Sequence, residues 1–261
     1  MANVWDLLSL DGSVAIVTGG RGNFGRQIVA ALAEAGAITF VASRNKDALE
    51  HLSAEHQAEG RDVRPMYLDL SEEASILKLR DNVMRQVGKV DILVNNAVAR
   101  VMTGWDDDAC KFDESMHVNA TGTFVITRAI GEVMIPRRKG SIVNIASMMG
   151  MVGLEQHNYD GTNMGGWPGD YFFHKGGMIN FTRFCASYFG RYDIRVNSVS
   201  PGGLRSESQP ERFVQSYSER TQLGRLCGED DLKGLIVLLG SRAGSYITGA
   251  NIPVDGGYTA K

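Results

Sequence analysis

Short runs of β-branched and other apolar residues alternate with longer stretches of helical periodicity along almost the whole chain. The first runs are residues 14–18, 38–43 and 63–68, and each is followed by a helical pattern. Strands that alternate with helices in this way form βαβ units, whose strands lie parallel in one sheet. The sequence therefore predicts an α/β fold built on a doubly wound parallel sheet.

The pattern continues to the end of the chain and predicts seven strands in total. The expected strands are residues 14–18, 38–43, 63–68, 91–95, 141–146, 194–200 and a last one near 252. The expected helices are residues 24–35, 46–59, 72–87, 110–137, 170–189, 211–220 and 230–240. Because no repeat or flexible linker divides the 261 residues, one domain spanning 1–261 is preferred over two.

Charge and cysteine content argue against several classes of protein. With 27 Lys and Arg against 30 Asp and Glu, the chain has no basic surplus for binding nucleic acid. Cys110, Cys185 and Cys227 are an odd number without metal-ligand spacing, which disfavours a disulfide framework or a zinc site. No apolar run reaches the roughly 18 residues of a membrane span, and no signal peptide is recognisable, so we expect a cytoplasmic protein.

A glycine-rich turn joins the first strand to the first helix. Residues 18–25 read Thr-Gly-Gly-Arg-Gly-Asn-Phe-Gly. Glycines let a backbone approach a pyrophosphate closely, and the free N–H groups of a helix N-terminus favour its negative charge. This context favours a dinucleotide site over a tight turn with a purely structural role.

The same turn resembles the cofactor turn of the short-chain dehydrogenase/reductase family, although Asn23 replaces the usual middle glycine. We expect Asn23 to be accepted there because asparagine tolerates left-handed backbone. The resemblance implies a single Rossmann domain that binds NADP or NAD. The cofactor-binding residues that it implies are Gly19, Arg21, Asn23, Phe24, Gly25, Ser43, Arg44, Asp69, Leu70, Asn96, Ala97, Tyr171, Lys175, Pro201 and Gly202.

The end of the second strand bears on the choice of cofactor. A site selective for NAD normally places a carboxylate there, but this chain has Ser43 and Arg44 and no acid before Asp47. Arg44 and Ser43 could bind a 2′-phosphate through charge-assisted hydrogen bonds, which favours NADP. The alternative is that Arg44 only stacks on the adenine and that either cofactor is accepted.

Tyr171 and Lys175 are four residues apart on an expected helix, so they lie on one face of it. A neighbouring ammonium stabilises a phenolate and makes the tyrosine a usable acid and base. The family resemblance extends to Ser147, whose hydroxyl would hold the substrate oxygen, and to Asn119, which would hold a proton-relaying water. It also implies that Lys175 binds the ribose of the nicotinamide. The alternative for each residue alone is an ordinary structural role.

The segment 148–170 between Ser147 and Tyr171 is longer than is usual in the family, and a second segment, 206–226, resembles the family's substrate lid. The side chains of the first segment combine polar groups with aromatic faces: Glu155, Gln156, His157, Asn158, Tyr159, Asp160, Thr162, Asn163 and Trp167. Such a lining favours a sugar, sugar acid or polyol as substrate, as in gluconate dehydrogenase-like members. A loop that covers an oligomer surface is the alternative.

The predicted reaction is the NAD(P)-dependent interconversion of a secondary alcohol and a ketone. The competing functions are a non-catalytic NAD(P) sensor, a reductase of less polar ketones, and an epimerase or dehydratase. His157 and His174 lack ligand spacing, so no metal is expected. The resemblance implies a homotetramer or homodimer built through residues 110–137 and 170–189, where Phe181, Phe184 and Tyr188 fit an interface or a core equally well.

Overall fold

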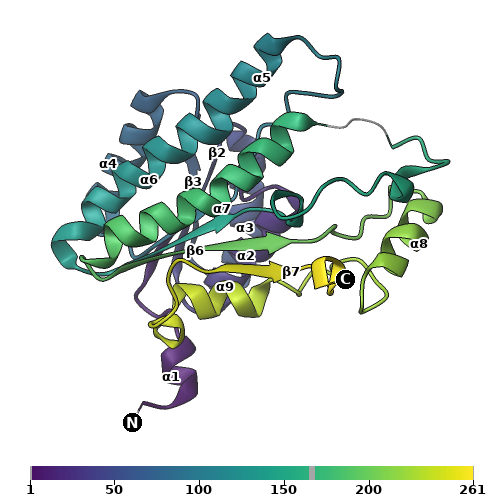
Figure 1. The fold of residues 1–261 in the computed structure, drawn as a ribbon. Coiled ribbons are helices and arrows are strands. Elements are labelled where there is room, and N and C mark those ends of the chain that lie inside the picture. Colours follow the sequence, from purple (N-terminus) through teal and green to yellow (C-terminus); the bar gives the residue numbers. More distant parts are fainter. Residues whose placement is uncertain (1, 165–167, 261) are drawn as a thin grey trace.

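The computed structural model describes residues 2–164 and 168–260, and a seven-stranded parallel sheet lies at its centre (Figure 1). The strand order is β3-β2-β1-β4-β5-β6-β7. The strands are β1 Val14–Thr18, β2 Ile38–Ser43, β3 Val63–Tyr67, β4 Ile92–Asn95, β5 Gly140–Ile145, β6 Ile194–Pro201 and β7 Asn251–Val254. The predicted fold class and the seven strands are confirmed: the parallel sheet is open, and helices bury both of its faces.

Helices cover both faces of the sheet (Figure 1). One layer contains α2 Asn23–Glu34, α3 Lys46–Ala58 and α9 Lys233–Gly240. The other contains α4 Glu73–Val87, α5 Ala109–Met116, α6 Thr123–Met134 and α7 Gly169–Gly190. Two further helices lie outside these layers, α1 Val4–Leu8 and α8 Glu211–Arg220. No helix of the described part of the chain is both long and apolar enough to cross a membrane.

Each helical layer closes a separate hydrophobic core against the sheet. Leu32 of α2, Leu52 of α3 and Ile236 of α9 belong to one cluster of fully buried side chains. Ile76 of α4 and Ile126 of α6 belong to the cluster on the opposite face. Because both faces are sealed by apolar packing, the polar chemistry of the chain is left to the ends of the strands.

The helix predicted over residues 110–137 is not continuous. A π-helical segment, His117–Gly122, separates α5 from α6, and the 3₁₀ turn Ile135–Arg137 ends the run. Periodicity alone does not reveal a π turn, because one extra residue leaves the apolar stripe almost intact. The prediction of one uninterrupted helix is therefore wrong, and the interruption contains Asn119.

The segment 148–170 is less irregular than expected, because it contains the 3₁₀ turns Met148–Gly150 and Gln156–Tyr159. Trp167, which we expected to line the substrate site, lies outside the described residues. Helix α1 was not anticipated, since its 5 residues are too few to show a period. The Asn3 side chain caps it by accepting a hydrogen bond from the Trp5 N–H.

Candidate active site

The carboxyl ends of β1 and β4 lie next to each other where the strand order reverses, the usual ligand crevice of a doubly wound sheet. Gly19 has a φ of +67°, and a Cβ there would be 2.7 Å from the Ala97 Cα. Asn96 fixes the same turn by donating from Nδ2 to the carbonyls of Thr18 (3.1 Å) and Gly19 (2.9 Å). A residue with a side chain at position 19 would force the two strand ends apart.

The N-terminus of α2 opens from this turn. Its N-cap residue is Gly22, which has no side chain to accept hydrogen bonds from the first N–H groups of the helix. A Cβ at Gly25 would collide with the Gly19 carbonyl, while Phe24 packs against the core and Arg21 is exposed. Asn23 is the first residue of the right-handed helix, so our reason for accepting it there, left-handed backbone, is wrong.

The carboxyl ends of β2 and β3 form the other end of the crevice. The Ser43 Oγ is buried and has no hydrogen-bond partner among the described residues, while Arg44 is exposed. The Asp69 carboxylate accepts hydrogen bonds from the Ser71 hydroxyl (2.7 Å) and N–H (2.9 Å). The Ser71 hydroxyl bond lowers the pKa of Asp69, burial opposes this, and the nearby charge of Arg44 adds to the lowering.

These features fit a dinucleotide. The glycine cradle and the uncapped helix suit a pyrophosphate, and the orphaned Ser43 hydroxyl beside Arg44 suits a ribose hydroxyl or phosphate. The Leu70 carbonyl lies directly against Gly122, since a Cβ at Gly122 would collide with it. At the end of β6, after Pro201, the Gly202 N–H donates to the Val254 carbonyl of β7 at 3.0 Å.

Lys175 and Tyr171 share one face of α7, as predicted. The Lys175 Nζ lies 5.6 Å from the centre of the Tyr171 ring and donates to the Ile145 carbonyl at 2.6 Å. Lys175 is only 3% exposed, which excludes the ordinary alternative of a solvated surface charge. Burial lowers the pKa of Lys175 to about 7, and the charge of Arg100 contributes. An ammonium that titrates near neutrality can exchange protons with its surroundings.

Ser147 follows β5 and lies beside the same helix. Its Oγ accepts a hydrogen bond from the Met149 N–H at 3.1 Å and begins the 3₁₀ turn Met148–Gly150. This turn packs directly on α7, since a Cβ at Gly150 would be 2.6 Å from the Lys175 carbonyl carbon. The structure thus brings the end of β5 against the helix turn that contains the tyrosine and lysine.

Asn119 is buried in the π-helical segment, next to the loop that follows β4. Its Oδ1 accepts from the Ala99 N–H and its Nδ2 donates to the Ala99 carbonyl, both at 2.8 Å. Nδ2 also donates to the Ser115 Oγ at 3.0 Å, and Ser115 in turn donates to the Asp170 carboxylate. One chain of hydrogen bonds therefore connects the β4 exit, the π turn and the first turn of α7.

His174, which the sequence indicates as a polar helix position and not a metal ligand, is buried. Neither ring nitrogen has a hydrogen-bond partner within the described residues, and burial followed by the charge of Lys175 lowers its pKa to about 3. His174 is therefore a neutral imidazole at physiological pH. The described residues contain no cluster of His, Cys, Asp and Glu able to hold a metal ion.

Helix α8, in the segment resembling a lid, packs together with the 148–170 segment. Phe213 and Tyr217 of α8 form a small apolar cluster with Met148, Leu226 and Tyr258. The Tyr159 ring lies 5.2 Å from that of Phe213, and Glu155 pairs with Arg220 at 2.8 Å. The Asn158 Nδ2 donates to the Tyr258 hydroxyl at 2.8 Å. Glu155 thus binds α8, and Asn158 binds the 3₁₀ turn that contains Tyr258.

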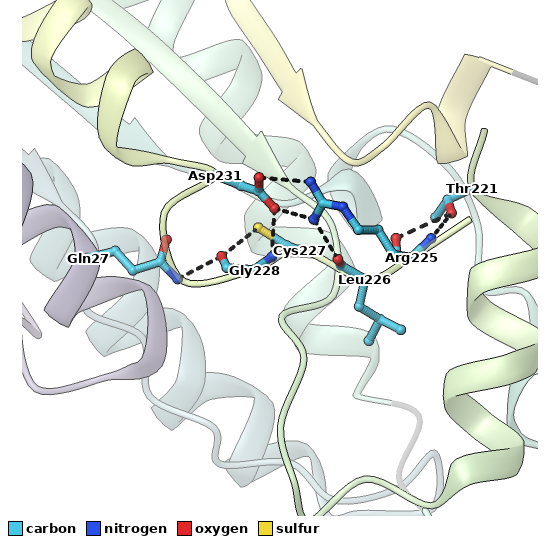
Figure 2. A network of polar contacts seen from close by, with 7 residues as sticks. All are labelled: Gln27, Thr221, Arg225, Leu226, Cys227, Gly228 and Asp231. Carbon is cyan, nitrogen blue, oxygen red and sulfur yellow. Dashed lines mark hydrogen bonds and ion pairs between the residues drawn. The ribbon is translucent and has the colours of Figure 1, made fainter. Parts of the chain in front are cut away.

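A network of polar contacts fixes the segment that follows α8 (Figure 2). The Asp231 carboxylate accepts from both terminal nitrogens of Arg225, at 2.5 and 3.0 Å, and from the Gly228 N–H at 2.6 Å. The Gln27 Nε2 donates to the Gly228 carbonyl at 3.3 Å and so connects this network to α2. Helix α8 is therefore anchored at its C-terminal side to α2, the helix that begins at the glycine turn.

Arg100 was missed by the sequence analysis. It follows β4 in a stretch without a motif, and nothing in its local pattern distinguishes it from an ordinary surface arginine. In the structure its guanidinium carbon lies 5.5 Å from the centre of the Tyr171 ring. Only the packing of the β4 exit against α7 brings the two together.

We expect Gly19→Ala to lower cofactor affinity more than tenfold, because a left-handed alanine costs about 1–2 kcal/mol and its Cβ would also displace Ala97. Fluorescence titration with NADPH measures the affinity. Gly88→Ala is the matched control, since Gly88 has a φ of +71° and open space around it. Unchanged cofactor binding in Gly19→Ala would contradict the assignment of the turn.

Comparison with known proteins agrees with this geometry. Residues 21–259 match the family model described as enoyl-(acyl carrier protein) reductase. The chain is 30% identical to gluconate 5-dehydrogenase of Gluconobacter oxydans, over 97% of each chain. It superposes on a gluconate 5-dehydrogenase from Burkholderia cenocepacia in complex with NADP and tartrate, with a TM-score of 0.89, 28% identity and 99% and 100% coverage.

A second solved structure, an NAD⁺-bound xylitol dehydrogenase, is similar with a TM-score of 0.85, 28% identity and coverage of 95% of this chain and 99% of that one. The match of the family model and the similarity to dehydrogenases both extend over nearly the whole chain. The chain belongs to the short-chain dehydrogenase/reductase family and is an NAD(P)-dependent oxidoreductase.

Proposed function

We propose that this oxidoreductase interconverts a secondary alcohol and a ketone on a small polar substrate, a sugar, sugar acid or polyol, with Asn119, Ser147, Tyr171 and Lys175 as its catalytic residues. The observation that carries the proposal is the buried Lys175 beside Tyr171 at the carboxyl edge of the sheet. A non-catalytic sensor would have no use for an ammonium held in this costly position without a carboxylate partner.

The proposed chemistry divides between cofactor and protein. The nicotinamide, when bound, supplies or accepts the hydride. In the reducing direction the Tyr171 hydroxyl donates its proton to the carbonyl oxygen, and in the oxidising direction the phenolate accepts the alcohol proton. The Ser147 hydroxyl donates a hydrogen bond to the same oxygen. Lys175 holds the nicotinamide ribose and, with a water bound at Asn119, returns the proton to Tyr171.

Replacing Tyr171 by Phe removes the hydroxyl and keeps the ring that packs on His174 (5.3 Å between centres). We expect turnover to fall at least 10³-fold while NADP(H) still binds, because only the proton transfer is lost. The assay follows reduced nicotinamide absorbance with panels of polyols, sugar acids and keto sugars. Tyr246→Phe, at a fully exposed tyrosine outside α7, should leave turnover unchanged. Retained turnover in Tyr171→Phe would refute the catalytic assignment.

Two results on substrate range would separate the remaining alternatives. Binding of NADP(H) without turnover of any alcohol or ketone would favour a sensor. Strong turnover of bulky apolar ketones and none of sugars would favour a reductase of less polar substrates. A polar substrate is supported by the 148–170 segment, which packs against the lid 206–226 and places Tyr159 near the charge of Arg100.

We further propose that NADP is the preferred cofactor. Support comes from the unpartnered Ser43 Oγ, the exposed Arg44 at the end of β2, and the engagement of the Asp69 carboxylate by Ser71. The residues directly after β2 include no carboxylate, which would repel a 2′-phosphate.

Arg44→Gln tests this preference. Loss of charge-assisted hydrogen bonds to a phosphate should raise the KM for NADP about 10- to 100-fold and change the KM for NAD less than threefold. Steady-state kinetics with both cofactors give the ratio. Lys46→Gln removes a neighbouring surface charge that pairs with Glu50 and serves as the control. An equal loss for both cofactors would show that Arg44 only stacks on the adenine.

A homo-oligomer, either a tetramer or a dimer, is proposed from the outer face of α6 and α7. Phe184 (63% exposed), Tyr188, Phe124 and Phe173 present aromatic surface there, beside a cavity of about 220 Å³ lined partly by Phe181. Exposed aromatic patches of this kind mark association surfaces. The exposure of Phe184 and Tyr188 excludes a core position for both and supports an interface at this face.

Phe184→Glu places a charge on this face and should convert the oligomer to smaller species in light scattering after size exclusion. Tyr67→Glu, on the edge strand β3, introduces the same charge elsewhere and should leave the assembly intact. An unaltered mass for Phe184→Glu would argue against the interface.

A cytoplasmic location is proposed from cysteine chemistry. Cys110, Cys185 and Cys227 are all free thiols. Burial raises the pKa of Cys185 to about 12, so this thiol stays protonated and unreactive. Unpaired thiols of this kind are usual in a reducing compartment.

A further inference from the structure

Arg100 is a charged side chain at the proposed site that the mechanism does not use. Its residue is exposed, and its guanidinium lies over the Tyr171 ring at 5.5 Å. Among the described residues it makes no ion pair and no hydrogen bond. A guanidinium has five N–H donors in a planar fork that matches the two oxygens of a carboxylate.

The backbone that carries Arg100 is held firmly. Ala99, the preceding residue, exchanges two hydrogen bonds with the buried Asn119 side chain, both at 2.8 Å. Asn119 lies on the π-helical segment, which is wound into the helical layer of the core. The backbone position of Arg100 is therefore set by the same amide that belongs to the proposed proton relay.

The charge of Arg100 reaches the reacting groups. It contributes to the low pKa of Lys175, after burial, and it opposes the rise that burial causes in the pKa of Tyr159. The charge of Arg100 therefore acts both on the α7 face with Tyr171 and Lys175 and on Tyr159 of the 148–170 segment. A substrate carbinol that meets Tyr171 would come close to this guanidinium, because the guanidinium lies over the Tyr171 ring.

Four carboxylates of the neighbouring segments are engaged elsewhere. Asp107 binds Lys111 at 2.6 Å together with the N–H groups of the turn before it, and Asp170 accepts from Ser115. Glu155 pairs with Arg220, and Asp160 pairs with His157 at 3.1 Å. Arg100 is thus a cation beside the reacting tyrosine that forms no ion pair with the described residues.

We propose that Arg100 binds the carboxylate of the substrate, which makes the substrate a short hydroxy acid of the sugar-acid type and not a neutral polyol. The inference rests on the proposed function, because it assumes that the substrate carbinol meets Tyr171. Since the guanidinium lies against the Tyr171 ring, the carboxylate and the reacting carbinol must be only a few carbons apart. The bidentate pair would also fix which carbinol of a polyhydroxylated chain reaches the phenol.

Gluconate and glucitol form a matched pair of probes, because they differ only in carboxylate against hydroxymethyl at one end. We expect wild-type enzyme to prefer gluconate. Arg100→Gln should raise the KM for gluconate and lower the ratio of kcat/KM values, gluconate over glucitol, by about 10- to 100-fold. Arg100→Lys, which keeps the charge but loses the fork, should retain part of the preference. Arg85→Gln, an exposed arginine of α4 that bonds only to Asn82, should leave the ratio unchanged.

Arg100 could instead only position Tyr171 or tune Lys175. In that case Arg100→Gln would lower kcat/KM for gluconate and glucitol equally and shift the pH profile for both, which would overturn the proposal. A wild-type preference for glucitol would overturn it as well.

A binding measurement separates failure of this inference from failure of the proposed function. Calorimetric titration of the NADP-loaded enzyme with tartrate and with threitol, its neutral counterpart, needs no turnover. Tartrate binding that is lost in Arg100→Gln but kept in Arg85→Gln would support the anion site even if neither gluconate nor glucitol reacts. Absent tartrate binding in the wild type, or equal binding in Arg100→Gln, would overturn the site while leaving the Tyr171 assignment intact.

Discussion

All seven strands run parallel, and this single constraint brings the proposed site residues that end or follow a strand to one edge of the sheet. Parallel strands send their carboxyl ends to one edge of the sheet, where helix N-termini and loops also begin. Gly19 follows β1, Asn96 follows β4, and Ser147 follows β5. Ser43 is the last residue of β2, and Arg44 follows it. Had any strand run the other way, its polar end would lie at the opposite edge, among the turns that connect helices back to strands.

At this edge, glycines allow close backbone contact and buried amides keep it in place. The approach of the β1 and β4 exits depends on Gly19, whose carbonyl accepts a hydrogen bond from the Asn96 side chain. Asn119 binds Ala99 in the loop that leaves β4. Burial then gives the site its electrostatic character. Lys175 is buried without a carboxylate, and Arg100 adds a second positive charge. The Arg100 guanidinium and, when it is protonated, the Lys175 ammonium favour an anionic group of the substrate near this phenol.

Much of the fold and half of the site were predictable from local pattern. The strands and most helices followed from periodicity, and the glycine turn and the Tyr171–Lys175 spacing followed from residue type and position. The errors have local causes as well. The π turn is not visible in the apolar periodicity, and α1 is too short to show a period. Asn23 is helical because the left-handed conformation in this turn belongs to Gly19. Nothing in the neighbouring residues marks Arg100 as part of a site.

The sequence by itself determined the α/β class, the order of elements and the residue types at each strand end, because these depend on patterns a few residues long. The tertiary structure decided which side chains are buried and which unlike segments meet. Lys175 reads as a surface charge until its Nζ is placed on the Ile145 carbonyl, and His174 reads as polar surface until its imidazole is enclosed. Arg100 meets Tyr171, 71 positions later in the sequence, only because the loop that leaves β4 comes to lie beside α7. Burial and long-range contact depend on the whole packed chain, and they set the charges with which this site can act.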